Sequence, residues 1–516
     1  MMSFFLLYRN LKSSPIVIMK MADILGVYPK TGYDIKNSSV ELPLGLLSTV
    51  STLHADYNVK ILDQRVDDNF ESNFSNELSK GPRVVLIPSM TGTQLKYALD
   101  ISRSVKNNSK SVVLWGGVHA TLMPEQTIGH NLIDMIVVGE GEFVLQNIMA
   151  ALDGKTKLDS VNGIAYKENG AIKMNPRAES PDPNKIPEIP YDLVDVENYV
   201  KSGGISFDAK ERTLPFISSR GCPYTCTFCS TAGISKGNWR SMTAELAYER
   251  VSKMVKKYKL NVVKFYDENF TSNPRRAERI AEMINGEFSW SMQARMDNML
   301  ITDMKKLEEG GLRVVEPGVE SGSDRILKLI NKAENKATMI AANKKLAQTN
   351  IKAFYNFMMG FPGESYEELM ETVDLALQLV KENRNAHITQ FYIFVPYLGA
   401  PLFDYAVQQG FVVPKTLEEW VAFSRQQTYT PWIQDKKEML ETIMYTSKFV
   451  DGKRLCQVLR NTRVPKFFIR ALSANYKKNW EKHKFEKTAS IKFLDMMVKR
   501  SFGWESGTTF EMAQTE

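Results

Sequence analysis

Three of the four cysteines in this 516-residue chain lie in one short run, and their spacing points most directly to chemistry. Cys222, Cys226 and Cys229 are spaced as C-x3-C-x2-C. A loop with three thiolates can bind three irons of a cubane iron–sulfur cluster. It is one ligand short of the four that a closed cluster or a structural zinc site requires. One iron of such a cluster is therefore open to another ligand.

Two structural alternatives fit these cysteines less well. A zinc site needs a fourth cysteine or histidine nearby, whereas the next residues of these types, His387 and Cys456, follow far downstream. A disulfide framework is typical of short secreted chains with many cysteines, and this chain has only four. We therefore expect a reduced, cytoplasmic protein. Cys456 lies outside every motif, and we expect it to be a small buried hydrophobic residue without function.

The cysteine loop, with Phe228 directly before its last cysteine, resembles the signature of the radical S-adenosylmethionine (SAM) enzymes. The resemblance implies that Cys222, Cys226 and Cys229 bind a 4Fe-4S cluster, and that the amino and carboxylate groups of SAM chelate its fourth iron. It also implies that the reduced cluster cleaves SAM to a 5'-deoxyadenosyl radical. A one-electron reductant such as ferredoxin or flavodoxin would then be a partner.

The segments around this loop alternate as a barrel requires. Apolar runs and helical patterns predict six βα units, a partial (β/α)6 TIM-like barrel over residues 209–412, with chemistry at the carboxyl ends of the strands. The cysteine loop follows the first of these strands. The expected strands cover residues 214–218, 262–265, 289–293, 314–319, 353–358 and 389–395, and the expected helices cover 244–258, 275–285, 302–309, 336–348 and 366–382.

Polar residues follow the second and third expected strands, and the resemblance implies roles for them. Asp267 and Glu268 would fix the amino group of SAM, and Gln293 and Arg295 would contact SAM or substrate. The alternative for Asp267 and Glu268 is that they are acids that favour the start of the next helix.

Two further strand ends complete the expected SAM site. By the same resemblance, Glu320 would hydrogen-bond the ribose hydroxyls, and the loop with Gly360, Pro362 and Gly363 would border the adenine. Residues 396–402 after the sixth strand resemble a substrate-side loop of the family.

The first part of the chain has the rhythm of a doubly wound parallel sheet. Strands are expected at 23–28, 60–62, 84–88, 112–115 and 135–138, with helices at 44–54, 94–105 and 142–152. The pattern predicts a flavodoxin-like domain over residues 22–155 that binds a ligand beyond the carboxyl ends of its strands. The residues expected to border that ligand are Ser89, Thr91, Gly116, Gly117, Gly139, Glu140 and Gly141.

The loops at 42–46, 116–125 and 138–142 resemble those of the cobalamin-binding domain found in class B radical SAM methyltransferases. The resemblance implies cobalamin as a third cofactor. No histidine of the chain lies in the D-x-H-x-x-G motif that places a ligand below cobalt in many such domains. Several members of the subclass also lack this motif, and a vestigial domain without cobalamin is the alternative.

The remaining segments connect or flank these domains. Residues 1–21 form an N-terminal extension, and residues 156–208 form a hairpin around Asn169-Gly170 and a proline-rich linker. Residues 413–516 are basic and mainly helical. Cations and aromatic residues at 464–470 and 479–482 suit a peripheral contact with the inner face of a membrane, or simply a solvated helix face. No nucleic-acid partner and no membrane-spanning segment are expected.

The combined prediction is a radical SAM enzyme that, with cobalamin, methylates or remodels an unactivated carbon of a small-molecule or lipid substrate. The first alternative is oxidative cyclisation or ring rearrangement without methyl transfer. The second, of another class, is a cobalamin or iron–sulfur sensor without turnover. The sequence does not identify the substrate.

Overall fold

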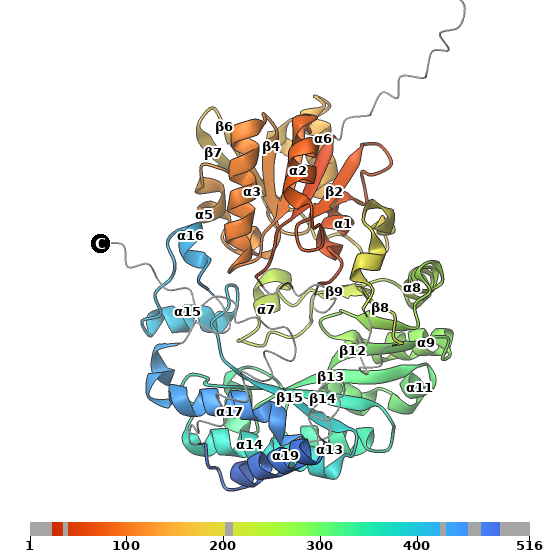
Figure 1. The fold of residues 1–516 in the computed structure, drawn as a ribbon, viewed down its shortest axis with the longest axis vertical. Coiled ribbons are helices and arrows are strands. Elements are labelled where there is room, and N and C mark those ends of the chain that lie inside the picture. Colours follow the sequence, from red (N-terminus) through yellow and green to blue (C-terminus); the bar gives the residue numbers. More distant parts are fainter. Residues whose placement is uncertain are drawn as a thin grey trace, which may run out of the picture.

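The computed structural model describes residues 23–32, 34, 40–201, 210–423, 430–451 and 466–485. The expectations for residues 1–21 and for Cys456 lie outside these ranges, as do residues 424–429, 452–465 and 486–516 of the basic C-terminal region. Figure 1 shows a first α/β domain stacked on a second, larger one, with β9 and α7 between them.

The first domain contains a mixed sheet in the order β2-β1-β3-β4-β5-β6-β7. Strands β1 to β5 are parallel in the flavodoxin-like order, which confirms the predicted fold class. Its elements are β1 (Ile24–Tyr28), α1 (Leu44–Val50), β2 (Val59–Asp63), α2 (Phe70–Ser79), β3 (Val84–Pro88), α3 (Gln94–Asn108), β4 (Val112–Gly116), α4 (Val118–Leu122), α5 (Pro124–Gly129), β5 (Met135–Val137) and α6 (Glu142–Leu152).

The predicted hairpin forms β6 (Ile164–Glu168) and β7 (Ala171–Met174). Asn169 and Gly170 both have positive φ, as a tight hairpin turn requires. Strand β6 pairs antiparallel with β5, so the hairpin extends the first sheet instead of belonging to the linker, where the sequence had placed it. A short 3-10 helix, η1 (Leu158–Ser160), precedes the hairpin, and the linker after it contains η2 (Tyr191–Leu193) and η3 (Val196–Tyr199).

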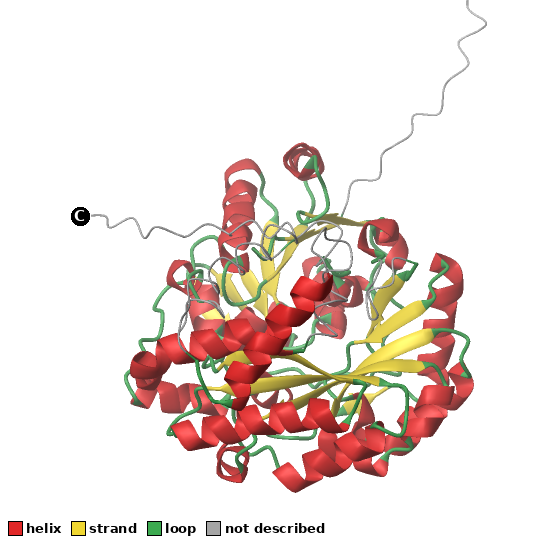
Figure 2. Cartoon of the chain, turned by 60° about the horizontal axis from the view of Figure 1, so that its bottom comes forward, coloured by secondary structure: helices red, strands yellow, loops and turns green. Residues whose placement is uncertain are grey.

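The second domain is a six-stranded parallel sheet in the order β15-β14-β13-β12-β11-β8, the predicted partial barrel. Figure 2 shows this sheet curving inside a ring of helices. Its elements are β8 (Thr213–Phe216), β9 (Ser219–Arg220), α7 (Ser230–Ser235), β10 (Arg240–Ser241), α8 (Ala244–Tyr258), β11 (Val262–Phe265), η4 (Phe270–Ser272), α9 (Pro274–Ile284), β12 (Ser289–Arg295), α10 (Met296–Ile301), α11 (Met304–Glu309), β13 (Leu312–Glu320), α12 (Asp324–Leu329), α13 (Lys336–Leu346), β14 (Lys352–Met359), α14 (Tyr366–Glu382) and β15 (Ala386–Ile393).

The C-terminal region is helical, as predicted, but it does not form a separate layer. Helix α15 (Pro401–Gln408) still lies within the range predicted for the barrel, and the C-terminal region contains α16 (Leu417–Trp420), η5 (Pro431–Lys436), α17 (Lys437–Val450) and α19 (Lys466–Glu481). Helix α17 covers the edge strand β15, where the backbone N–H of Phe391 donates to Ser447 Oγ (3.2 Å). Helix α16 instead packs on the first domain, with the Trp420 ring 5.8 Å from that of His119.

None of the helices in the described part of the chain is both long and apolar enough to cross a bilayer.

Candidate functional site

The cysteine loop follows β8 at the carboxyl end of the barrel sheet, and its backbone is held from two sides. The N–H of Thr227 donates to the carbonyl of Ile330 (2.9 Å), and the carbonyl of Thr227 accepts from the N–H of Leu402 (2.9 Å). The side chain of Asn331 donates to Thr225 Oγ1 (3.0 Å). The loop is therefore fixed between the segment after α12 and the start of α15.

The three thiols lie in a partly buried, cationic environment. Cys226 is buried, and Cys222 and Cys229 are half-buried. Burial raises the pKa of the Cys226 thiol, and the charges of Lys332 and Arg295 oppose this rise. Arg295 Nη1 lies 3.8 Å from Cys226 Sγ. Two cations beside Cys226 favour a bound thiolate there and the negative charge of a cluster.

The three thiols are a donor set that an iron–sulfur cluster uses. Among the described residues, no three His, Cys, Asp or Glu side chains surround one common metal position. An iron–sulfur cluster instead distributes its cysteine ligands over separate irons. The proposed ligands are Cys222, Cys226 and Cys229. When bound, such a cluster with SAM supplies one-electron cleavage of a carbon–sulfur bond.

The carboxylate of Asp267, one of the two acids expected to bind SAM, is engaged by the protein itself. Its side chain is fully buried, and its carboxylate accepts hydrogen bonds from Ser218 N (2.7 Å), Ser218 Oγ (2.7 Å) and Ser219 Oγ (2.5 Å). Arg276 contributes an opposite charge, although burial dominates and raises the pKa of Asp267. Asp267 therefore fastens β11 to the chain that enters the cysteine loop.

Glu268 points the other way, into the large cavity described below. Its side chain is exposed to that cavity, while protein encloses it on the other sides. This loss of surrounding water, with the charge of Asp267, raises the pKa of Glu268 to about 7. Of the two acids predicted to bind SAM, Glu268 alone keeps its carboxylate available.

Gln293 and Arg295 lie on the same face of β12, two residues apart. Gln293 is exposed although β12 is a central strand, so its side chain is open to solvent or a ligand. Arg295 is largely occupied: Nη2 donates to Asp297 Oδ2 (2.8 Å) and to the carbonyl of Lys332 (2.5 Å). Its guanidinium also lies 3.7 Å from the ring of Tyr224. Arg295 therefore braces the cysteine loop.

Glu320 ends β13 beside the cluster loop. It is a buried residue with a left-handed φ of 66°, a strained conformation for a residue with a side chain. Its Oε1 lies 3.2 Å from Nζ of the buried Lys332, which is also close enough to influence Cys226. A Cβ at Gly318 would meet the Glu320 carboxylate, so the glycine leaves room for it.

The loop with Gly360, Pro362 and Gly363 closes β14, and it contacts the cysteine loop through aromatic rings. The centroids of Phe228 and Phe361 are 6.1 Å apart. Glu364 Oε2 accepts from the N–H of Gly360 (2.6 Å), while burial raises the pKa of Glu364 to about 7. Glu364 therefore stabilises the loop that follows β14.

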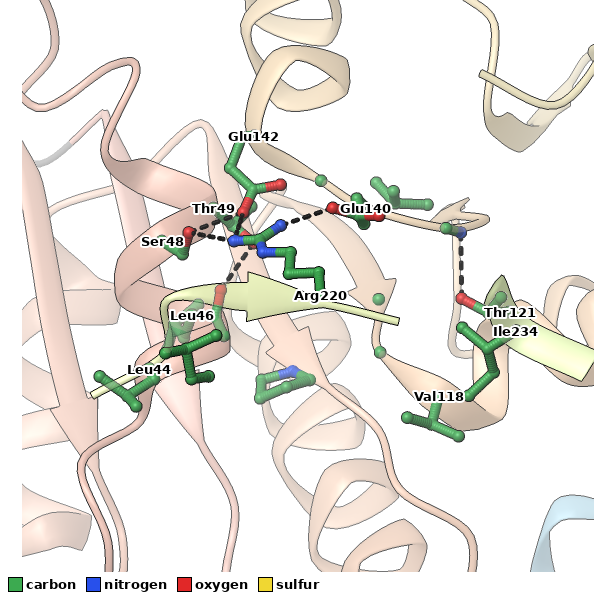
Figure 3. Close-up of a pocket in the computed structure, with 18 of the residues that line it drawn as sticks. Leu44, Leu46, Ser48, Thr49, Val118, Thr121, Glu140, Glu142, Arg220 and Ile234 are labelled. Atoms are coloured by element: carbon green, nitrogen blue, oxygen red, sulfur yellow. Dashed lines mark hydrogen bonds and ion pairs between the residues drawn. The ribbon is translucent and has the colours of Figure 1, made fainter. Parts of the chain in front are cut away.

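A cavity of about 550 Å³ opens between the two domains. Six of the seven residues predicted at the carboxyl edge of the first sheet line it: Ser89, Gly116, Gly117, Gly139, Glu140 and Gly141. The barrel contributes the stretch from Ile217 to Gly221, Tyr266 and Glu268. A Cβ at Gly117, where φ is 95°, would lie 2.7 Å from the carbonyl oxygen of Ser89, so the close loops require glycine. Figure 3 shows part of this lining.

Thr91 is the seventh residue, and it lies apart from the cavity lining. Its hydroxyl is 2.9 Å from Nδ1 of the fully buried His119. Burial lowers the pKa of His119 to about 4, and its Nε2 has no partner. Thr91 and His119 pack beneath α16, so the structure does not support contact between Thr91 and a ligand in this cavity.

The cavity suits the corrin-type ligand that the loops imply. Its walls combine apolar side chains from the sheet with glycine backbone at the strand ends, which permits a flat ligand to approach closely. The residues that would hold cobalamin are the six lining residues named above. When bound, cobalamin supplies a transferable methyl group.

Several lining residues escaped the sequence interpretation. The linker contributes Arg177, Glu179 and Ile186 to the cavity wall, and Tyr266 donates from its hydroxyl to Glu41 Oε1 across the domains (2.6 Å). Arg220 also lines the cavity. Arg220 lies just before the first cysteine of the loop. This proximity is the one feature in the sequence that could have marked any of these residues as part of the site.

Two family models match the chain. The radical SAM superfamily model matches residues 216–376, and the B12 binding domain model matches residues 35–149. The first segment contains the cluster loop. The second contains most of the loops by which the first domain lines the cavity.

Known proteins are similar along most of the chain. An uncharacterized methyltransferase of Pyrococcus horikoshii is 32% identical over 404 residues, which cover 77% of this chain and 85% of the relative. Cytidylyl-2-hydroxyethylphosphonate methyltransferase of Streptomyces wedmorensis is 25% identical, covering 82% and 88%. The structure of the cobalamin-dependent SAM radical enzyme OxsB with aqua-cobalamin bound has the same fold, with a TM-score of 0.68, 17% identity and coverage of 94% and 76%.

The two matching models, the three-cysteine loop and the extended similarity agree in one assignment. The chain belongs to the cobalamin-dependent radical SAM enzymes, which combine an N-terminal B12-binding domain with a radical SAM barrel.

Proposed function

We propose that this enzyme transfers a methyl group to an unactivated carbon of a small molecule or lipid bound in the cavity between its domains. The observation that carries the proposal is the shared lining. Gly117 and Gly139 border the cavity from the cobalamin side, and Gly221 and Glu268 border it from the cluster side. A substrate in this space would contact both halves of the chemistry.

The chain's own residues would orient the reactants and exclude water. Glu268 would hold the amino group of SAM, Gln293 would contact the substrate, and Glu320 would hold the ribose. Phe228 and the loop from Gly360 to Gly363 would enclose the adenine. These roles rest on the positions described above and on the family's pattern.

The proposal is tested by measuring which two products the enzyme forms from SAM. Methyl transfer requires S-adenosylhomocysteine as well as 5'-deoxyadenosine, whereas ring formation without methyl transfer yields only 5'-deoxyadenosine. A sensor yields neither product in catalytic amounts. The assay uses anaerobic, reconstituted protein with SAM, cobalamin and a one-electron donor such as ferredoxin or flavodoxin.

Replacing Glu268 by glutamine is expected to weaken SAM binding about tenfold at pH 8, because a hydrogen bond from the SAM amino group to a charged carboxylate is worth about 1.5–3 kcal/mol. With its pKa raised to about 7, the Glu268 carboxyl is ionised at pH 8 and mostly neutral at pH 6. Wild-type affinity should therefore fall as the pH drops from 8 to 6. The affinity of E268Q should stay nearly constant.

Equilibrium dialysis of SAM against reconstituted protein measures both affinities. Glu179→Gln is the matched control, because Glu179 lines the same cavity from the linker. Its SAM affinity should follow that of the wild type at both pH values. An unchanged pH dependence in E268Q would exclude Glu268 from SAM binding.

A peripheral membrane contact would suit a lipid substrate. Near its start, α19 exposes Phe467 and Phe468, whose exposed fractions are 75% and 52%. Lys466 and Arg470 are exposed beside them. This combination of aromatic and cationic side chains supports a contact with an anionic bilayer. Retention on anionic vesicles at low salt, but not on zwitterionic ones, tests it.

A further inference from the structure

The loop that carries the cluster cysteines is closed at its base by two very short strands. In β9 and β10, Arg220 pairs with Arg240 and Ser219 pairs with Ser241 in antiparallel register. All three cysteines lie between Arg220 and Arg240 in the chain. Whatever holds these two arginines therefore holds both ends of the cluster loop.

Both arginines bind the same carboxylate of the other domain. Arg220 Nη1 donates to Glu140 Oε2 (2.6 Å), and Arg240 Nη2 donates to Glu140 Oε1. Glu140 lies between Gly139 and Gly141, in the loop that borders the cavity from the cobalamin side. One carboxylate thus joins the base of the cluster loop to the cobalamin loop, as Figure 3 shows for Arg220.

Arg220 has a second, more deeply buried anchor. Its Nη2 donates to Glu142 Oε1 (2.6 Å) and to Ser48 Oγ (2.9 Å), and Ser48 donates to the same Glu142 oxygen (2.6 Å). Glu142 is the first residue of α6, and its side chain is only 3% exposed. Arg220 outweighs the effect of burial and keeps the pKa of Glu142 below its usual value. This ion pair is shielded from solvent, so salt screens it little.

The base of the loop is equally fixed to the barrel. Asp267 binds Ser218 and Ser219, and Arg276 donates to the carbonyls of Met242 (2.7 Å) and Ser218 (3.0 Å). The short strands β9 and β10 thus connect three parts: the barrel, the cluster loop and the cobalamin loop. Without Arg220, Glu140 keeps its contact with Arg240 and Glu142 keeps its contact with Ser48, but Glu142 loses its link to the base of the cluster loop.

We propose that Arg220 is a positioning residue that couples cobalamin binding to cluster binding by holding the cluster loop and the cobalamin loop at one separation. The inference rests on the proposed function, because it requires both cofactors to bind here. Cluster ligation would attach the loop that Arg220 begins at three further points, so the loop would have less freedom left to lose when cobalamin binds. By linkage, cobalamin favours the ordered cluster loop by the same factor.

Cobalamin affinity with and without the cluster measures this coupling. Hydroxocobalamin is titrated by anaerobic equilibrium dialysis against cluster-free and reconstituted full-length protein, and the ratio of the two dissociation constants is recorded. We expect the wild type to bind at least about fivefold more tightly when the cluster is present, the lower end of typical couplings. In Arg220→Gln the ratio should fall to about one.

Two further variants sharpen the test. Glu140→Gln removes the carboxylate shared by both arginines but leaves Glu142, so its ratio should fall between those of the wild type and R220Q. It replaces R220Q if that variant does not fold. Arg212→Gln is the matched control, because Arg212 pairs with Glu197 (2.7 Å) in an exposed ion pair away from the cavity. Its ratio should equal that of the wild type.

The possible results distinguish a failure of this inference from a failure of the proposed function. A wild-type ratio of one, or an equal ratio in wild type, R220Q and E140Q, overturns the coupling and leaves the proposed function standing. Failure of the wild type to bind cobalamin in either state overturns both.

Discussion

Replacing Cys226 by alanine is expected to abolish iron–sulfur cluster binding and, with it, the formation of 5'-deoxyadenosine from SAM. Cys226 is the most buried of the three thiols and lies next to Arg295 and Lys332. Two remaining cysteines hold too few irons for a stable cluster. Iron and sulfide content per chain, followed by product analysis under reducing conditions, measures both effects.

The fourth cysteine provides the matched control. Cys456 lies outside the three-cysteine run in the sequence, so Cys456→Ala should reconstitute as much iron as the wild type. Full iron content in C226A, or an equal loss in both variants, would contradict the assignment of the cluster to residues 222–229.

Replacing Asp267 by alanine is expected to lower the free energy of unfolding by about 3–5 kcal/mol, the range for breaking a buried charged network. The substitution leaves three donors of Ser218 and Ser219 without their acceptor and leaves the buried Arg276 without its neighbouring carboxylate. Urea unfolding of the cluster-free protein measures the loss.

The control for this prediction is an exposed carboxylate. Asp192 pairs with Lys257, and their side chains are 79% and 51% exposed. Asp192→Ala should therefore change stability by less than about 1 kcal/mol. A small effect of D267A, together with a specific loss of SAM affinity, would restore the earlier interpretation of Asp267 as a SAM ligand.

Apolar runs and helical periodicity predicted the elements that position the site, and the structure shows what stabilises two of these helices. Helix α8 spans the expected residues because Thr243 caps it, and its hydroxyl accepts from the N–H of Leu246. Helix α14 also spans its expected residues, because Ser365 and Glu368 form a capping box at its start. The strand ends followed from apolar runs, so the cysteine loop, Glu268 and the glycine loops were placed at the correct edges of their sheets.

Contacts between residues far apart in the chain determine the remaining features of the site, and no local sequence pattern encodes such contacts. Asp267 and Glu268 are adjacent and chemically alike, yet neighbouring side chains at a strand end face opposite ways. Only the folded position of Ser218 shows that Asp267 is already engaged. Likewise Arg220 meets Glu142 from 78 residues away in the chain, and α16 reaches back to His119.

The central claim is that cluster and cobalamin chemistry share one cavity, and the two products of SAM test it most directly. Reduced, reconstituted protein with bound cobalamin is expected to form 5'-deoxyadenosine and at least one equivalent of S-adenosylhomocysteine per cobalamin. Without cobalamin only 5'-deoxyadenosine should form, and C226A with cobalamin should form only S-adenosylhomocysteine. Formation of S-adenosylhomocysteine that does not depend on cobalamin, or its absence from the complete system, would contradict the claim.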